Sequence, residues 1–351
     1  MAISLTQPAV GSTDWGSNVN NNWQTIQDAL NSSGGSKNKI INGNMNVAQR
    51  GTGAISCPSA TNTYTVDRWI VNPATAQITA QQDSARTPPN VDSYNNLKLT
   101  GAASVGTVDI IQRIEAAIAR SLKKTVSFSA QIYNNTGASF TPTLMIGTPS
   151  AADDFTTVNV RNGGGSGDSL QPCGDGQWTT VSWTADISGY TNINYGLQVQ
   201  LRIPSGVLVA TKVVNITQIQ LETGSAPTNF EHLFPQQELA LCQRYCYVTG
   251  GLLNYQIFGT GVAYSTTGAE SIVQLPVVMR ATPTFACSNV SDFILTDGTN
   301  FSGAFSALSL EKYDGLNVQL IITATTLTQY RFYYLAANNT TNARLTFNAE
   351  L

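Results

Sequence analysis

Short runs of alternating hydrophobic and polar residues constrain the fold of this 351-residue chain more than any other feature. The run 125–132 alternates in this way, and the same period returns at 181–187 and 197–203. Turn sequences such as Asp175-Gly176 separate the runs. A strand with one buried face requires a period of two. Many short strands of this kind predict a mainly β chain with a jelly roll or β-sandwich at its centre.

Two stretches of the central region depart from a simple alternation. The hydrophobic phase slips between Ile216 and Ile219, which predicts a β-bulge. In 110–124, the spacing of Ile111, Ile114 and Ile118 fits a helix. We therefore expect a helical turn or short helix before the strand that begins at 125.

The last hundred residues predict a second β module. Hydrophobic residues alternate with polar ones from Ala343 to Leu351, and aromatic residues recur at every second position from Tyr330 to Tyr334. The pairs Asp297-Gly298 and Asp314-Gly315 indicate hairpins, because glycine tolerates the positive φ of tight turns. We expect a C-terminal β-sandwich tip whose last strand lies in a sheet.

The N-terminal region predicts one amphipathic helix, within residues 13–31. Its hydrophobic stripe consists of Trp15, Val19, Trp23, Ile26 and Leu30. A lone helix of this length is marginal in water, so the stripe needs a partner surface, either the chain's own β domain or sister chains. The flexible sequence 32–36 that follows favours an oligomeric bundle with sister chains.

Composition excludes several function classes. Only 11% of the residues are charged, against about 25% in a typical soluble domain. A surface of amides and hydroxyls suits neutral polyhydroxylated ligands or burial against other copies, although β-rich extracellular proteins also favour such residues. The 18 Lys and Arg residues are spread thinly, so we expect no nucleic-acid binding. We also expect neither a secretory signal nor membrane insertion, since no hydrophobic run approaches about 20 residues.

Several segments resemble one protein family. They read IQLETGSAPTNFEHLFPQQELALCQRYCY at 219–247, IQRIEAAIARSLKKTVSFSAQI at 111–132 and NKIINGNMNVAQRGT at 38–52. These segments resemble bacteriophage tail fibre proteins that contain a carbohydrate-binding-module-like jelly roll. The shorter TDWGSNVNNNWQTIQDAL at 13–30 and VQLPVVMRATPTFACS at 273–288 resemble stalk and tip pieces of such fibres.

The resemblance implies three parts and a place in the virion. Residues 1–36 are expected to form a helical attachment and trimerisation segment with a linker, residues 37–235 the jelly roll, and residues 236–351 a connecting helix and the tip. The implied protein is a homotrimer of the virion tail, made in the host cytoplasm. Its N-terminus would bind baseplate or adaptor proteins, and its β modules would contact host-surface glycan.

Within the segment 219–247 we expect a helix from Gln236 to Cys246. Its two cysteines, Cys242 and Cys246, would share a buried face beside Leu239 and Tyr245. Phe230 and Phe234 are expected to anchor the segment by packing. With five cysteines and no CxxC pair, neither a disulfide framework nor a zinc site is predicted.

No catalytic constellation is evident in the sequence. The single histidine, His232, lies among hydrophobic neighbours and is expected to pack rather than act as a base. A glycosidase needs two carboxyl groups facing one cleft, and nothing in the sequence pairs them. We expect no enzyme and no cofactor, with a glycan depolymerase and a free carbohydrate-binding module as alternatives. A structural calcium ion is a weaker possibility, with Asp153, Asp154 and Asp168 as its ligands.

Aromatic residues that border turns are the candidates for stacking on sugar rings. In the central module these are Trp178, Tyr190 and Tyr195, whereas Trp183 follows the inward phase of its strand and is expected in the core. In the C-terminal module the candidates are Tyr255, Tyr264 and Tyr313. The sequence does not choose between the two surfaces.

Overall fold

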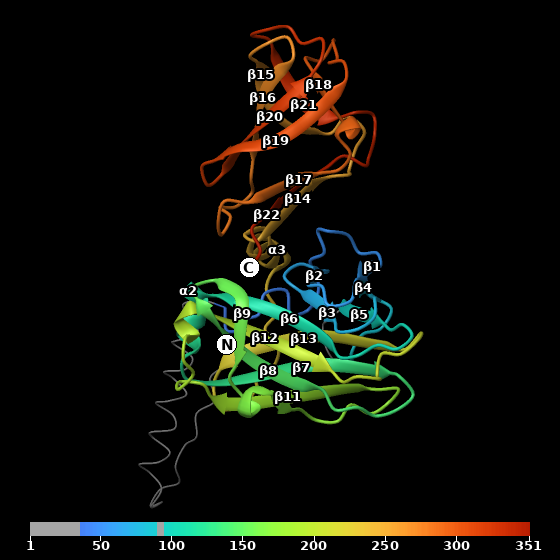
Figure 1. The fold of residues 1–351 in the computed structure, drawn as a ribbon, viewed down its shortest axis with the longest axis vertical. Helices are drawn as coiled ribbons and strands as arrows, with labels where there is room; N and C mark the ends of the chain where they lie inside the picture. Colours follow the sequence, from blue (N-terminus) through green and yellow to red (C-terminus); the bar gives the residue numbers. More distant parts are fainter. Residues whose placement is uncertain (1–35, 90–94) are drawn as a thin grey trace, which may run out of the picture. The chain divides into compact units, whose positions relative to one another are not determined.

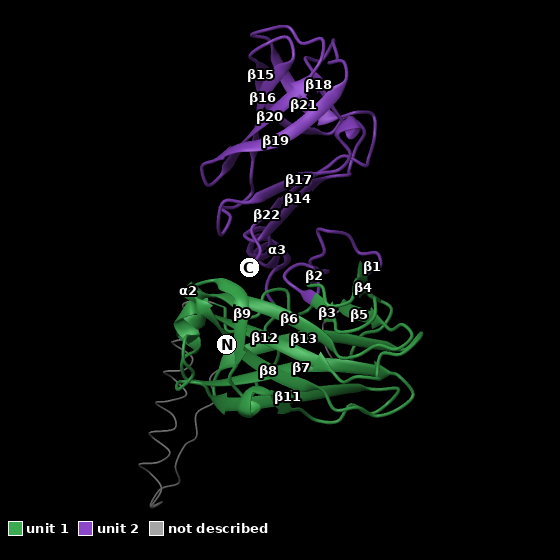
Figure 2. Cartoon of the chain, in the orientation of Figure 1, with its two compact units in different colours: residues 1–44, 56–62, 71–232 green, residues 45–55, 63–70, 233–351 purple. Residues whose placement is uncertain are grey.

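A computed structural model describes residues 36–89 and 95–351 of the chain. The stripe of the expected oligomerisation helix, Trp15 to Leu30, lies outside the described residues. The chain divides into two compact units (Figure 2). Unit 1 contains residues 1–44, 56–62 and 71–232, and unit 2 contains residues 45–55, 63–70 and 233–351. Two short early segments are therefore part of the same unit as the C-terminal region.

Unit 1 is a β-sandwich of two antiparallel sheets (Figure 1). The first sheet has the order β1 (Ile55–Cys57), β4 (Ile78–Asp83), β5 (Asn96–Thr100), β13 (Val213–Thr223), β7 (Thr125–Asn135) and β11 (Trp178–Asp186). The second has the order β10 (Asp168–Ser169), β8 (Thr143–Ala151), β12 (Gly196–Ile203), β6 (Val108–Glu115) and β3 (Ile70–Pro73), and β9 (Asp154–Val160) pairs with β8. The mainly β class is confirmed, and the expected jelly roll is confirmed as a two-sheet sandwich.

The period of two explains the core of unit 1. In β7, Phe128, Ala130 and Ile132 point inward and are buried, while Ser129 and Gln131 lie on the outer face. In the second sheet, both faces of the central strands are largely buried. In β12 every residue except Arg202 is buried.

The bulge predicted in β13 is confirmed. Thr217 pairs with Gln131 of β7 and Gln220 pairs with Ser129, so three steps along β13 match two steps along β7. The extra residue is Gln218, whose φ of 51° lies in the left-handed region.

The helix expected in 110–124 is only half correct. A short helix α2 (Ala116–Ala119) and a 3₁₀ turn η1 (Arg120–Leu122) do precede β7. Residues 110–115, however, belong to strand β6. Both faces of this strand are largely buried, so its hydrophobic residues do not simply alternate with polar ones, and Ile111 and Ile114 match helical spacing by coincidence.

Unit 2 is a second β-sandwich, as expected. Its larger sheet has the order β18 (Phe293–Thr296), β21 (Phe332–Ala337), β15 (Ile257–Ala263), β16 (Gly268–Gln274), β20 (Asn317–Ala324) and β19 (Phe305–Tyr313). Its smaller sheet has the order β14 (Cys246–Gly250), β22 (Arg344–Asn348) and β17 (Thr284–Cys287). The predicted last strand is confirmed: β22 is central in its sheet, and Leu345 and Phe347 are fully buried.

The helix expected in 236–246 is present but shorter. Helix α3 (Pro235–Gln243) starts with proline at its first turn, where the missing N–H costs nothing. Cys246 begins β14, so the expectation that both cysteines lie on one helix is wrong, although both are buried. Phe234 is 76% exposed, so its expected role as a packing anchor is also wrong. No helix among residues 36–89 and 95–351 is long and apolar enough to span a membrane.

A buried charge cluster connects the early segments of unit 2 to its C-terminus. The Arg68 guanidinium pairs with the Glu350 carboxylate and lies 3.5 Å from the ring centroid of Tyr245. Arg50 also reaches Glu350, with 3.3 Å between Nη2 and Oε1. The side chains of Arg68 and Glu350 are at most 3% exposed. Two residues far apart in sequence thus neutralise each other in the interior, which such charges require.

The cysteines in the described part of the chain are all free thiols. Burial raises the pKa of Cys57 to about 12 and the pKa of Cys173 and Cys246 to about 11, and it raises the pKa of Cys242 well above its usual value. These groups are therefore neutral and unreactive at neutral pH.

We predict that Glu350→Gln lowers the free energy of unfolding of unit 2 by about 3–5 kcal/mol, because it leaves the buried Arg68 without its carboxylate. Urea denaturation followed by fluorescence measures this loss. Glu311→Gln is the control, since Glu311 is exposed on β19. An unchanged midpoint for Glu350→Gln would show that the pair is not needed for stability.

We also predict that Ellman's reagent at pH 8 reacts with at most one thiol in the folded protein and with five in guanidinium chloride. The half-buried Cys287 is the one that can react. Rapid native labelling of two or more thiols would contradict the burial described above.

Candidate functional site

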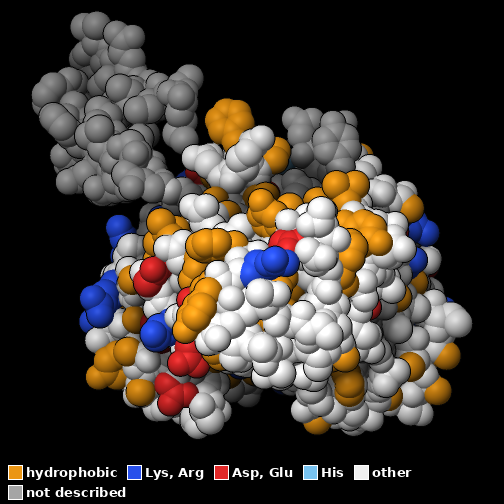
Figure 3. All heavy atoms as spheres, turned by 90° about the horizontal axis from the view of Figure 1, so that it is seen from above, with side chains coloured by type: hydrophobic (Ala, Val, Ile, Leu, Met, Phe, Trp, Pro, Cys, Tyr) orange, Lys and Arg blue, Asp and Glu red, His pale blue; other side chains and the backbone are white. Residues whose placement is uncertain are grey.

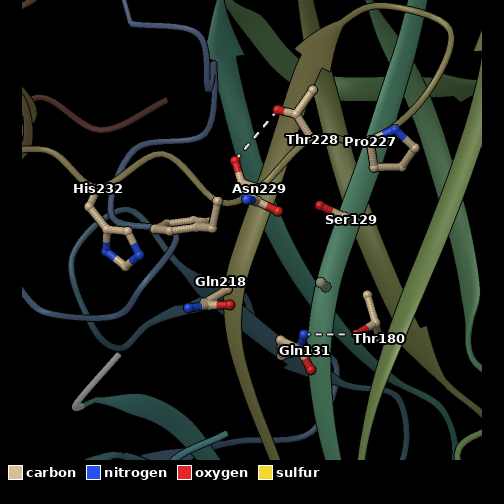
Figure 4. A pocket seen from close by; sticks show the side chains of 10 residues that line it. Ser129, Gln131, Thr180, Gln218, Pro227, Thr228, Asn229 and His232 are labelled. Atoms are coloured by element: carbon tan, nitrogen blue, oxygen red, sulfur yellow. Dashed lines mark hydrogen bonds between the residues drawn. The ribbon is translucent and has the colours of Figure 1, made fainter. Parts of the chain in front are cut away.

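A cavity of about 550 Å³ in unit 1 opens on the outer face of the first sheet (Figure 4). Its volume falls in the range of about 300–1,000 Å³ that is usual for ligand pockets. Strands β7, β11 and β13 and the loop 224–232 supply its lining. The lining residues are Ser129, Ala130, Gln131, Thr180, Gln218, Pro227, Thr228, Asn229, Phe230 and His232. We call this cavity the β13 pocket.

Paired side chains of β7 and β11 form one wall of the β13 pocket. Thr180 lies opposite Gln131 in the register, and the Gln131 amide donates a hydrogen bond of 2.8 Å to the Thr180 hydroxyl. Figure 4 shows these two side chains together at one end of the group. The hydrogen bond fixes the amide, so that its oxygen remains available to a ligand.

The bulge residue Gln218 contributes the most unusual side chain of the pocket. Its side chain is only 6% exposed, and its Nε2 has no hydrogen-bond partner. A buried donor without an acceptor costs about 1–3 kcal/mol. The positive φ of 51° adds backbone strain. Both costs fall on one residue that lines the pocket.

Buried polar side chains of β13 hold the loop 224–232 over the sheet. The Glu222 carboxylate accepts hydrogen bonds from the Thr228 backbone N–H at 2.7 Å and from the Thr228 hydroxyl at 2.8 Å. The Gln220 side chain accepts from the Glu231 N–H at 2.9 Å and donates to Glu222 at 2.8 Å. Lys37 donates to the Asn229 carbonyl at 2.7 Å. The loop is therefore fixed by several hydrogen bonds before any ligand arrives.

Two rings from the loop 224–232 form another side of the pocket. The edge of one ring meets the face of the other in the pair Phe230 and His232, with centroids 5.0 Å apart. Beneath Phe230 lies Gly43, where an added Cβ would come within 2.1 Å of the Ile219 carbonyl oxygen and 3.2 Å of the Phe230 ring. His232 is exposed and lines the pocket, so packing on Phe230 describes only part of its role.

The lining of the β13 pocket contains no Asp, Glu, Lys or Arg. Its polar groups are amides, hydroxyls and the His232 imidazole, and its apolar side chains are Phe230 and Pro227. Such a surface can donate and accept hydrogen bonds and can cover a small apolar patch. It offers no carboxyl pair for acid–base hydrolysis of a glycosidic bond.

The aromatic candidates of unit 1 lie at two places. Trp178 is on the same face of the sheet as Gln131 and Thr180, and its ring packs 5.6 Å from that of Tyr133. Tyr190 and Tyr195 do not line the pocket, and Tyr195 belongs to the 3₁₀ turn η3 (Ile193–Tyr195). Burial, with a smaller contribution from Asp168, raises the pKa of Tyr190.

Trp183 is half-buried rather than a full core residue. Its indole N–H donates a hydrogen bond of 2.8 Å to Asp168. The expectation that it belongs to the core is therefore only partly met.

The aromatic candidates of unit 2 do not share one cavity. Tyr255 packs against Phe301 with centroids 6.2 Å apart, and Tyr264 is exposed beside Gly268. The Tyr313 hydroxyl accepts a hydrogen bond of 2.8 Å from the Met279 N–H, which gives it a structural role. A separate hollow of about 290 Å³ on the larger sheet is lined by Thr260, Gly261, Asp297, Phe332, Tyr333 and Tyr334.

The three acidic residues considered for calcium each bind protein donors. Asp153 accepts from the Ala116 N–H at 2.7 Å, Asp154 accepts from the Thr156 N–H at 3.0 Å, and Asp168 accepts from Asn162 and Trp183. Within residues 36–89 and 95–351, no group of three His, Cys, Asp or Glu side chains is placed to hold a metal ion.

The candidates predicted from the sequence were aromatic residues, and they did not include Gln131, Gln218 and Thr228. The slip in phase at 216–219 was the one sequence signal that could have led to Gln218, because the extra residue of a bulge is often turned toward a site. Nothing in the sequence places Thr228 over β13.

No family model matches the chain, and no curated protein matches it. Among solved structures, it is similar to the CBM22-2 xylan-binding domain of Paenibacillus barcinonensis Xyn10C, at 12% identity over 48% of this chain and 99% of that one, with a TM-score of 0.33. It is also similar to the family 11 carbohydrate-binding module of Clostridium thermocellum, at 11% identity over 51% of this chain and 99% of that one, with a TM-score of 0.29.

A third similarity is to tailspike protein 4 of bacteriophage CBA120, at 12% identity and a TM-score of 0.31. It covers 53% of this chain and 21% of the tailspike domain. At this level of identity and superposition, none of the three likenesses transfers a ligand or an activity to this chain.

Proposed function

We propose that this protein is a non-enzymatic structural component of a bacteriophage tail fibre that binds a neutral glycan in the β13 pocket. The observation that carries the glycan-binding part is the lining of amides, hydroxyls and the rings of Phe230 and His232, without Asp, Glu, Lys or Arg, around the buried amide of Gln218. Sugars present hydroxyl groups that need both donors and acceptors, and amides supply both.

The pocket favours a neutral sugar over an acidic one. A uronic or sialic acid would carry its carboxylate into a lining that holds no Lys or Arg. Burying that charge unpaired is costly. A neutral pyranose can instead place its C–H face on Phe230 and its hydroxyls against Gln131, Thr180 and Gln218.

The fibre part of the proposal rests on the sequence segments at 219–247 and 111–132 and on the low charge of the chain. Figure 3 shows one face on which white uncharged side chains and backbone predominate, with hydrophobic side chains between them and few charged ones. In the proposed homotrimer, linked copies of a weak glycan site would act together, which raises avidity without new contacts. The N-terminus would join baseplate or adaptor proteins.

We predict that Gln131→Leu weakens binding to neutral polysaccharide from the host envelope by about two- to tenfold, the value of one or two neutral hydrogen bonds. Isothermal titration calorimetry measures the change. The matched control is Gln81→Leu, because Gln81 lies on β4 of the same sheet and does not line the pocket. Equal affinities of the variant and the wild type would count against this pocket, and release of reducing ends would indicate a depolymerase.

We predict that the full chain is a trimer with a mass about three times 37.4 kDa. Multi-angle light scattering tests this prediction. A strictly monomeric full chain would contradict the fibre proposal while leaving glycan binding in the pocket intact.

A further inference from the structure

The outer face of β7 and β11 continues the polar lining of the β13 pocket into an aromatic surface. Three pairs of opposed residues follow one another along the two strands: Ser129 with Ser182, Gln131 with Thr180, and Tyr133 with Trp178. Successive pairs on one face of a sheet are about 7 Å apart, so the three pairs span about 13 Å. This length exceeds a single sugar ring.

The aromatic pair at the far end of this surface is held in place by its own ring contact and by a neighbouring guanidinium. The rings of Tyr133 and Trp178 are 5.6 Å apart and tilted by 59°, and the Arg86 guanidinium lies 4.4 Å from the Tyr133 ring centroid. Tyr133 and Trp178 are half-buried, so each keeps part of its ring accessible. A fixed ring with an accessible face suits the apolar C–H face of a pyranose.

The orphan donor of Gln218 lies on the neighbouring strand β13, one residue after Thr217, which pairs with Gln131. This amide is more than nine-tenths buried, lies on a strained bulge and makes no hydrogen bond through Nε2. Its neighbours in the lining are polar and uncharged. An acceptor oxygen that enters the pocket would remove the cost of the unpaired donor.

We propose that the β13 pocket is one end of an extended site that takes a linear, neutral oligosaccharide. One sugar unit places an oxygen on Gln218 Nε2, and a later unit of the same chain stacks on Trp178. This inference rests on the proposed glycan binding and adds the length of the ligand and the role of each end. Gln218 binds the sugar unit in the β13 pocket, and Trp178 makes the affinity depend on the length of the oligosaccharide.

Ligand length separates the two ends experimentally. The probes are four neutral series, the malto-, cello-, xylo- and chito-oligosaccharides of one to six units. Affinities are measured by NMR titration of the full chain. For the series that binds, we expect the affinity to rise by about tenfold between the shortest ligand that binds and the tetrasaccharide, the increment of one aromatic contact.

Three variants show which residue supplies each part of the affinity. Trp178→Ala should abolish the rise with length and leave the affinity for the shortest ligand unchanged, which also shows that the variant is folded. Trp178→Phe should restore most of the rise. Gln218→Met, which keeps the shape of the side chain, should lower the affinity for every length by about two- to tenfold.

Tyr195→Ala and Gln81→Met are the matched controls, since neither residue lies on this surface. A rise with length that survives Trp178→Ala would overturn the extended site and leave the pocket standing. A Gln218→Met variant with wild-type affinity would overturn the role of the orphan donor. Failure of all four series to bind would instead count against the proposed function itself.

Discussion

One extra residue in β13 determines the arrangement of the candidate site. Before the bulge, Val214 and Ile216 face the core, and after it Ile219 and Leu221 do. Without the insertion, the second half of the strand would turn its hydrophobic residues outward. The bulge keeps both halves in register with the core and places Gln220 and Glu222 beneath the loop 224–232. The pocket forms because β13, with its bulge, both buries hydrophobic residues in the core and binds the loop 224–232 through its outward polar side chains.

Much of this fold could be predicted from the sequence, because a half-buried strand has a simple signature. The strands at 125–132 and 344–348, the bulge and the start of α3 all followed from local patterns. Strand β6 did not, since a strand buried on both faces has no alternation to read. The grouping of segments 45–55 and 63–70 with the C-terminal region depends on pairing across more than 280 residues, such as Arg68 with Glu350, which no local pattern encodes.

The candidate site was harder to predict than the fold. Its ten lining residues come from three strands and a loop that are separate in sequence, and six of them carry ordinary hydroxyl or amide side chains. Such side chains occur throughout a chain of this composition, so residue type alone does not locate the site. Trp178 was found because it borders a turn and is aromatic. Its relation to Gln131 follows only from the pairing of β7 with β11.

The two units are not consecutive pieces of the chain, which limits how evolution can exchange them. Between residues 44 and 71 the backbone passes from unit 1 to unit 2 and back twice before the final passage at 232–233. A recombination event at that last boundary would bring in a foreign C-terminal region while leaving Arg68 in the recipient. The new region would then have to supply a carboxylate at the position of Glu350. Inheritance of this C-terminal unit is therefore tied to a short stretch near the beginning of the chain.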